Sequence, residues 1–116
     1  MCGFTGFVSR STAPDEKALR AMGDSIRHRG PDGEGHYIDK HCGIAHRRLS
    51  IIDLANGQQP MYSPDKRYVI AYNGEIYNFK LLREELISAG HTFLTSSDTE
   101  VLLHGYMEWG PEVLKK

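Results

Sequence analysis

The spacing of apolar and polar residues along the chain predicts short strands mixed with helices. Residues 3–8 form an apolar run, and residues 68–72 combine β-branched and aromatic side chains as strands do. Strand-like spacing also recurs between residues 35 and 53, and turn-forming residues follow at 56–57 and 63–65. Because strands and helices do not alternate regularly, the pattern favours the α+β class over a doubly wound parallel sheet.

Apolar residues at helical spacing predict three helices, which cover residues 15–29, 79–89 and 97–109. Asp15 is suited to cap the first helix, and Ser97 with Glu100 matches a capping box at the start of the third. We expect Gly30 to stop the first helix in a left-handed conformation, and Gly90 to end the second.

Length and charge exclude several classes of protein. The chain has 116 residues, which fits one compact domain, and its 14 Lys and Arg nearly balance 15 Asp and Glu, for a formal net charge of −1. That balance argues against nucleic-acid or acidic-membrane binding. No apolar run approaches the roughly 18 residues of a membrane helix, and no secretory signal is visible. We therefore expect a cytoplasmic protein without nucleic-acid or membrane partners.

The two cysteines lie in different contexts. Cys42 lies in an apolar segment, where a small buried thiol is the expected state. Cys2 follows Met1 directly, so that removal of Met1 would give it both a thiol and a free α-amine. A residue that carries both a nucleophile and a base can act as the N-terminal nucleophile of a hydrolase, as an N-terminal Thr does in other hydrolases. A cysteine at position two is nevertheless no motif, and taken alone it is more often without a role.

Asn73 and Gly74 follow the clearest predicted strand and are candidate oxyanion donors. An Asn side-chain amide and the N–H of a Gly that lets the backbone approach a ligand would make a two-donor hole. Asn-Gly between strand-like segments is also the leading short hairpin signal. From spacing alone the hairpin is the favoured interpretation.

Two charged residues are candidates for binding a zwitterion. Arg48 can clamp a carboxylate with two parallel hydrogen bonds, or it can be a solvated arginine on a strand edge. Asp98 can bind an ammonium group, although an acid in the first turn of a helix is favoured without further context. No second close pair accompanies Cys42 and His46, and no phosphate-binding loop occurs, so we predict no metal or nucleotide site.

Six short blocks occur in a fixed order along nearly the whole chain: MCGFTG at 1–6, RHRGPDG at 27–33, HRRLSIIDL at 46–54, GQQPM at 57–61, YNGEIYN at 72–78 and SDTE at 97–100. Together they resemble the N-terminal glutaminase domain of glutamine-hydrolysing asparagine synthetases. These are class II glutamine amidotransferases with the N-terminal-nucleophile hydrolase fold. We interpret the block at 27–33 as mainly structural.

The resemblance implies a reaction. Met1 would be removed, and Cys2 would attack the side-chain carboxamide of glutamine while its own amine acts as base through a water. Asn73 and Gly74 would hold the oxyanion. Ammonia would leave, and water would hydrolyse the glutamyl thioester on Cys2 to glutamate.

The resemblance also implies a binding site for glutamine. Arg48 would bind the α-carboxylate, and Glu75 and Asp98 would bind the α-ammonium. The substrate-binding residues that it implies are Arg48, Leu49, Ser50, Ile51, Ile52, Asn73, Gly74, Glu75 and Asp98.

The implied fold is a four-layer α-β-β-α sandwich of antiparallel sheets, incomplete here because the chain stops at Lys116 before the family's domain ends. In whole members of the family, ammonia passes through a tunnel to a C-terminal synthetase domain that activates aspartate with ATP and magnesium. That domain is absent, so no cofactor is expected in residues 1–116. The implied partners are glutamine and the synthetase domain, with a homodimer as an arrangement of the whole enzyme.

Two alternatives stay open. One is a glutaminase domain that feeds another ammonia acceptor, such as an amino sugar or a phosphoribosyl transferase. The other is an inactive binding module in which Met1 is retained and blocks the amine of Cys2.

Overall fold

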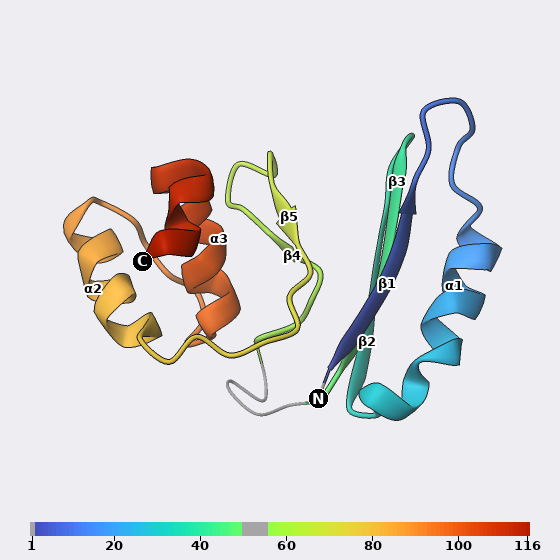
Figure 1. Cartoon of the computed structure of the whole chain (residues 1–116), viewed down its shortest axis with the longest axis horizontal. Helices are drawn as coiled ribbons and strands as arrows, with labels where there is room; N and C mark the ends of the chain where they lie inside the picture. The colour runs from blue at the N-terminus through green and yellow to red at the C-terminus, as the bar shows by residue number, and fades with distance from the viewer. Residues whose placement is uncertain (1, 50–55) are drawn as a thin grey trace. The chain divides into compact units, whose positions relative to one another are not determined.

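The computed structural model describes residues 2–49 and 56–116, and these form two compact units. Unit 1 holds residues 2–49, 58–60 and 71–74, and unit 2 holds residues 56–57, 61–70 and 75–116. Both contain antiparallel strands and helices (Figure 1), as the predicted α+β class requires. No helix among the described residues is long and apolar enough to cross a membrane.

Unit 1 is a three-stranded antiparallel sheet with a helix along it (Figure 1). Its elements are β1 (Gly3–Val8), α1 (Glu16–Ser25), a 3-10 turn (Arg27–Arg29), β2 (Gly33–Ile38) and β3 (Cys42–Arg48), and the strand order is β1-β3-β2. Leu19 of α1 and Ala45 of β3 are fully buried, and Gly23 brings α1 close to Ala45. The side chain of Asp15 caps α1 by accepting a hydrogen bond from Lys17 N at 2.9 Å, which confirms the predicted cap.

Arg47 joins the sheet to the end of α1. Its Nε donates to the carbonyl oxygen of Gly23 at 3.1 Å, and its guanidinium forms ion pairs with Asp24 and Glu34. Its side chain is buried. Arg47 therefore has a structural role at the carbonyl end of the helix, where a positive charge is favourable.

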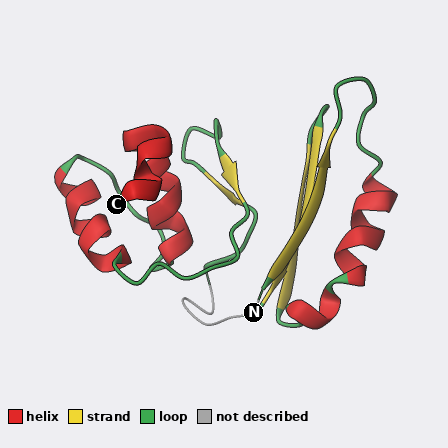
Figure 2. Cartoon of the chain, viewed as in Figure 1, coloured by secondary structure: helices red, strands yellow, loops and turns green. Residues whose placement is uncertain are grey.

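Unit 2 packs two helices beside a short hairpin (Figure 2). Its elements are β4 (Met61–Tyr62), β5 (Val69–Ile70), α2 (Phe79–Ser88), α3 (Asp98–Trp109) and a final 3-10 helix (Gly110–Lys115). The core is formed by Leu82, Leu86 and Val101, and the partly buried Ile76, Phe79, Phe93 and Trp109 pack against it. The predicted end of the second helix is confirmed, because Gly90 adopts a φ of +101° after Ala89 caps α2.

Three local predictions are wrong. Residues 68–72 form a strand only over Val69–Ile70, and Asn73 and Gly74 lie in irregular backbone before α2, so they do not turn a hairpin. Gly30 has an extended φ of −152° and follows the 3-10 turn, since α1 already ends at Ser25. Gly30 is needed because a Cβ there would collide with the main chain of Arg47.

The predicted capping box is only half formed. Ser97 caps α3 by accepting a hydrogen bond from Thr99 N at 3.1 Å. The Glu100 carboxylate instead turns to the preceding loop, where it accepts from Leu94 N at 2.8 Å and Thr95 N at 2.7 Å. Ser97 N donates to the Thr95 hydroxyl, so the group that Glu100 would have bound is already satisfied.

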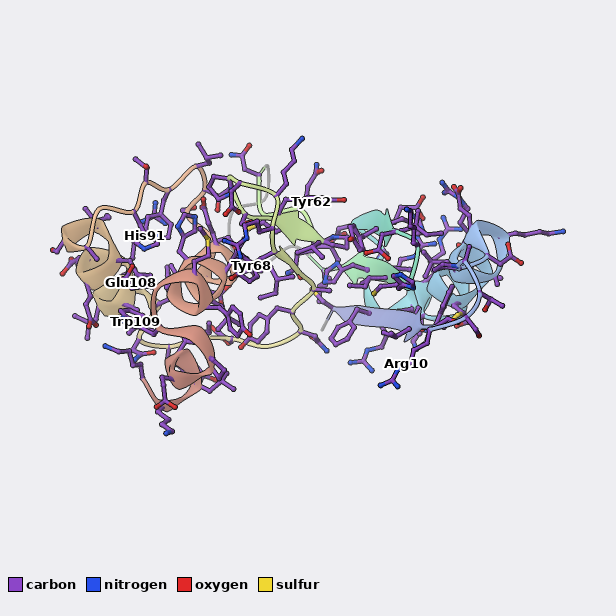
Figure 3. The ribbon with its side chains drawn as sticks, turned by 90° about the horizontal axis from the view of Figure 1, so that it is seen from above. Arg10, Tyr62, Tyr68, His91, Glu108 and Trp109 are labelled. Atoms are coloured by element: carbon purple, nitrogen blue, oxygen red, sulfur yellow. The ribbon has the colours of Figure 1, made fainter. Side chains whose placement is uncertain are left out.

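A partly buried histidine pair links α3 to the loop that follows α2. Nδ1 of His104 lies 2.9 Å from Nδ1 of His91. Nε2 of His91 lies 2.8 Å from the carboxylate of Glu108, and Figure 3 labels these last two residues. Burial lowers the pKa of His104, and the charges of His91 and Arg83 lower it further, against the opposing effect of Glu100. His104 is therefore held neutral in the folded protein at neutral pH.

The core of unit 2 gives a stability prediction. Leu86 is 0% exposed, whereas Leu81 on the same helix is 69% exposed. We expect Leu86→Ala to lower the free energy of unfolding by about 2–5 kcal/mol, because it removes buried methyl groups and leaves a cavity. Leu81→Ala should change it by less than about 0.5 kcal/mol. Urea unfolding measures both, and equal effects would contradict this assignment of the core.

The lowered pKa of His104 predicts that stability falls in mild acid. The unfolded chain binds a proton as the pH drops below 6.5, whereas folded His104 binds it only at lower pH. The unfolded state then holds more protons, so the free energy of unfolding decreases with falling pH, by at most about 1.4 kcal/mol per pH unit for this group.

His104→Gln removes this titration. We expect the loss of unfolding free energy between about pH 7.5 and pH 5.5 to be smaller in His104→Gln than in wild type. His28 is exposed, so His28→Gln is the control and should keep the wild-type loss. Denaturant unfolding at both pH values tests this, and an unchanged loss in His104→Gln would contradict it.

Candidate active site

The register of β1 against β3 brings Cys2 beside Leu49. Gly3 pairs with Arg47, so the residue before β1 lies next to the residues that end and follow β3. The half-buried Cys2 thiol donates to the carbonyl oxygen of Leu49 at 3.3 Å, and Leu49 N donates to Sγ at 3.2 Å. The main chain of Leu49 therefore fixes the position of the candidate nucleophile.

Arg29 also contacts Cys2 and was missed as a candidate functional residue. Its guanidinium donates to the Cys2 carbonyl oxygen at 3.4 Å. The neighbouring Gly3 is buried against the Arg29 side chain, since a Cβ there would lie 3.2 Å from Arg29 Cβ. The only sequence signal for this contact is the block at residues 27–33, whose predicted role is mainly structural.

Arg48 ends the central strand β3 and is only 9% exposed. The alternative of a solvated arginine on a strand edge is therefore wrong. Its main chain is held on the side of β2, where Arg48 O accepts from Asp32 N at 3.0 Å and Pro31 forms a bridge to Arg48. Arg48 is thus a buried cation one residue from Leu49, which contacts the Cys2 thiol.

His46 lies two residues before Arg48 and is 1% exposed. Neither of its ring nitrogens has a hydrogen-bond partner within the described structure. Burial lowers the pKa of His46, the charge of Arg48 lowers it as well, and the main chain of Tyr72 opposes these effects. His46 is therefore neutral at neutral pH and adds no second positive charge beside Arg48.

Asn73 and Gly74 belong to the same unit as Cys2 and Arg48. The preceding residue is anchored, because Tyr72 N donates to Oε1 of Gln59 at 2.6 Å. The Tyr72 ring lies against Gly74, where a Cβ would be 3.1 Å from Cε2 and would collide with the hydroxyl. Both candidate donors therefore lie on irregular backbone, whose N–H groups are not committed to a strand ladder.

Glu75 and Asp98 both lie in unit 2. Asp98 is the first residue of α3 and is 7% exposed, and its carboxylate accepts from Ile76 N at 3.0 Å. That bond brings the exposed Glu75, which precedes Ile76, close to Asp98 in the same unit. Asp98 is thus a first-turn acid, as predicted, and its carboxylate is bonded to the residue that follows Glu75. The remaining candidates, Ser50, Ile51 and Ile52, lie outside the described residues.

Across residues 2–49 and 56–116, no three His, Cys, Asp or Glu side chains come close enough together to hold a metal ion. Both cysteines are free thiols. The groups in unit 1 are a thiol, a buried guanidinium and an Asn-Gly pair on irregular backbone. Such groups suit nucleophilic attack on a carbonyl carbon with binding of an anionic group nearby.

Comparison with known proteins agrees with this chemistry. A family model described as "Glutamine amidotransferase domain" matches residues 1–116. Asparagine synthetase (glutamine-hydrolyzing) 1 of Bacillus subtilis (strain 168) is 48% identical over 120 residues, which cover 100% of this chain and 19% of that protein. Asparagine synthetase (glutamine-hydrolyzing) 2 of the same organism is 45% identical over 95% of this chain and 15% of its own length.

A plant relative gives the same result. Asparagine synthetase (glutamine-hydrolyzing) 2 of Arabidopsis thaliana is 44% identical over 98% of this chain and 20% of its own length. The chain thus spans 15 to 20% of the length of these three curated relatives. The comparisons confirm the resemblance predicted from the six sequence blocks.

Proposed function

The chain belongs to the glutamine amidotransferase domain family, and from this premise we propose that it hydrolyses glutamine to glutamate and ammonia, with Cys2 as nucleophile. The observation that carries the proposal is the Cys2 thiol held between the two main-chain groups of Leu49. Removal of Met1 gives Cys2 the free amine that serves as its base. That amine takes the thiol proton through a water, because direct transfer within one residue would need a strained ring.

The sulfur then attacks the carboxamide carbon of glutamine, and the negative charge moves to the amide oxygen. The Asn73 side-chain amide and Gly74 N–H stabilise this oxyanion by donating to it. When the tetrahedral intermediate collapses, the C–N bond breaks and the leaving nitrogen takes the proton back from the amine. Water next attacks the thioester, which releases glutamate and restores the thiol.

The proposed binding residues match glutamine at both ends of its zwitterion. Arg48 binds the α-carboxylate, which a buried guanidinium favours because its fork of donors matches a carboxylate. Asp98 and Glu75 bind the α-ammonium. This pairing of charges selects glutamine over a simple amide.

The larger setting is also part of the proposal. The relatives' names point to asparagine synthesis, in which a synthetase domain, supplied with ATP and magnesium, uses the ammonia to amidate aspartate. We place residues 1–116 in the four-layer α-β-β-α sandwich of the N-terminal-nucleophile hydrolases, as part of a glutamine amidotransferase domain. We also place the protein in the cytoplasm, where reducing conditions keep Cys2 a thiol.

The nucleophile is tested by Cys2→Ala. We expect this substitution to abolish ammonia release from glutamine, because no other group forms the thioester. Cys42→Ala is the matched control, since Cys42 is the other free thiol and has no role in the reaction. The assay uses protein whose intact mass shows that Met1 is removed. Ammonia release by Cys2→Ala at the wild-type rate would contradict the mechanism, as would full activity of protein that retains Met1.

The carboxylate clamp is tested by Arg48→Ala. We expect KM for glutamine to rise about 10- to 100-fold, the effect of losing a charged hydrogen-bonded pair, with kcat little changed. The contact is equally strong in ground and transition states, so its loss weakens binding alone. The KM of Arg48→Lys should lie between those of wild type and Arg48→Ala. Arg10→Ala changes an exposed position, and its KM should match that of wild type. Steady-state kinetics decide, and a fall in kcat at unchanged KM would refute the assignment.

A further inference from the structure

We infer that Gln59 is a positioning residue for the oxyanion donors Asn73 and Gly74. This inference rests on the proposed function, because the two donors have a role only in glutamine hydrolysis. It assigns a role to Gln59 of the GQQPM block at residues 57–61, to which the proposed reaction assigns none.

The hydrogen bond from Tyr72 N to Gln59 Oε1 is the central observation. It is 2.6 Å long, half-buried, and joins residues 13 positions apart. A backbone N–H can only donate, so the side-chain amide of Gln59 must present its oxygen here, which fixes its orientation. Tyr72 immediately precedes the first donor residue. Holding its nitrogen therefore fixes where the Asn73-Gly74 segment begins.

This anchor replaces the support that a strand would give. β5 ends at Ile70 and α2 begins at Phe79, so the backbone between them has no regular secondary structure. Residues 58–60 and 71–74 nevertheless both belong to unit 1, while the segments on either side of each belong to unit 2. The Gln59–Tyr72 bond joins these two stretches within unit 1.

Gln59 is itself fixed against the sheet of unit 1. Its main chain crosses Gly35 of β2 so closely that a Cβ on Gly35 would collide with the Gln59 carbonyl oxygen and lie 3.1 Å from Cδ of Pro60. Gly35 pairs with His46 in the central strand β3. The support therefore runs from the sheet, through the Gln59 main chain and side chain, to Tyr72.

Tyr72 also contacts the second donor residue, Gly74. Its ring lies against Gly74, with Cε2 3.1 Å from where a Cβ would be. The Tyr72 main chain is thus held by Gln59, while its side chain limits the position of Gly74. Oxyanion donors act only when aimed at the developing charge, and a displacement of about 1 Å can cost about 100-fold in rate. Gln59 acts through Tyr72 and should affect kcat rather than glutamine binding.

Three variants of the intact protein test the inference. Gln59→Leu removes the acceptor at similar size, and we expect kcat for glutamine hydrolysis to fall about 10- to 100-fold with KM within about twofold of wild type. Gln59→Glu keeps an accepting oxygen and should restore kcat to within about threefold of wild type. Gln58→Leu, at the exposed neighbouring glutamine, should match wild type and controls for the loss of an amide.

Amide hydrogen exchange at Tyr72 supplies a readout that does not depend on activity. Exchange should be faster in Gln59→Leu than in wild type and slow again in Gln59→Glu, because only the first loses the acceptor. Should Gln59→Leu fail to fold, Gln59→Asn shortens the reach by one methylene and must show the same loss of kcat and faster exchange.

The outcomes separate this inference from the proposed function. Wild-type kcat in the folded Gln59→Leu or Gln59→Asn variant overturns the inference, as does an equal loss in Gln59→Glu or a rise in KM alone. In each of these cases wild-type protein still releases ammonia, and the proposed function stands. A wild-type protein that has lost Met1 and releases no ammonia from glutamine overturns the proposed function, and the role of Gln59 with it.

Discussion

The antiparallel pairing of β1 with β3 is the constraint on which the candidate site depends. With Gly3 opposite Arg47, Cys2 lies beside Leu49, 47 positions away, and both main-chain groups of Leu49 bond to the thiol. Side chains alternate between the faces of a strand, so a slip of one residue would turn every one of them to the opposite face. The same register presents Arg48 at the end of the central strand. Sheet register therefore fixes the relation between nucleophile and cation.

The alternation of side chains also separates Arg47 from Arg48, the proposed carboxylate-binding residue. Arg47 and Arg48 are consecutive in β3 and so point to opposite faces of the sheet. Arg47 faces α1, where its guanidinium donates to Gly23 O and pairs with Asp24, and it also pairs with Glu34 of β2. Arg48 is on the other face, with the neutral His46 two residues before it. Arg47 is thus held by the elements of its own unit, and Arg48 is the buried cation that we propose as the carboxylate-binding residue.

The sequence pattern correctly predicted features that depend on residues adjacent in the chain. The Asp15 cap and the end of α2 depend on neighbouring residues. The errors arose where distant groups decide. Gln59 holds the backbone that the Asn-Gly signal would turn into a hairpin, and the main chain of Arg47 lies where a Cβ of Gly30 would be. For the site, the order of the blocks predicted the family, whereas Arg29 was missed because its contact with Cys2 exists only after folding.

The two bonds between Cys2 and Leu49 also bear on why the proposed reaction needs a free N-terminus. The thiol of Cys2 donates to the carbonyl oxygen of Leu49, and Leu49 N–H donates to the sulfur. Both main-chain groups position the sulfur, and neither is a base that can take its proton. A separate base must do that, and His46, two residues before Arg48, is buried rather than paired with the thiol. In the proposed reaction the α-amine of Cys2 fills this role, so that removal of Met1 is the step that completes the nucleophile.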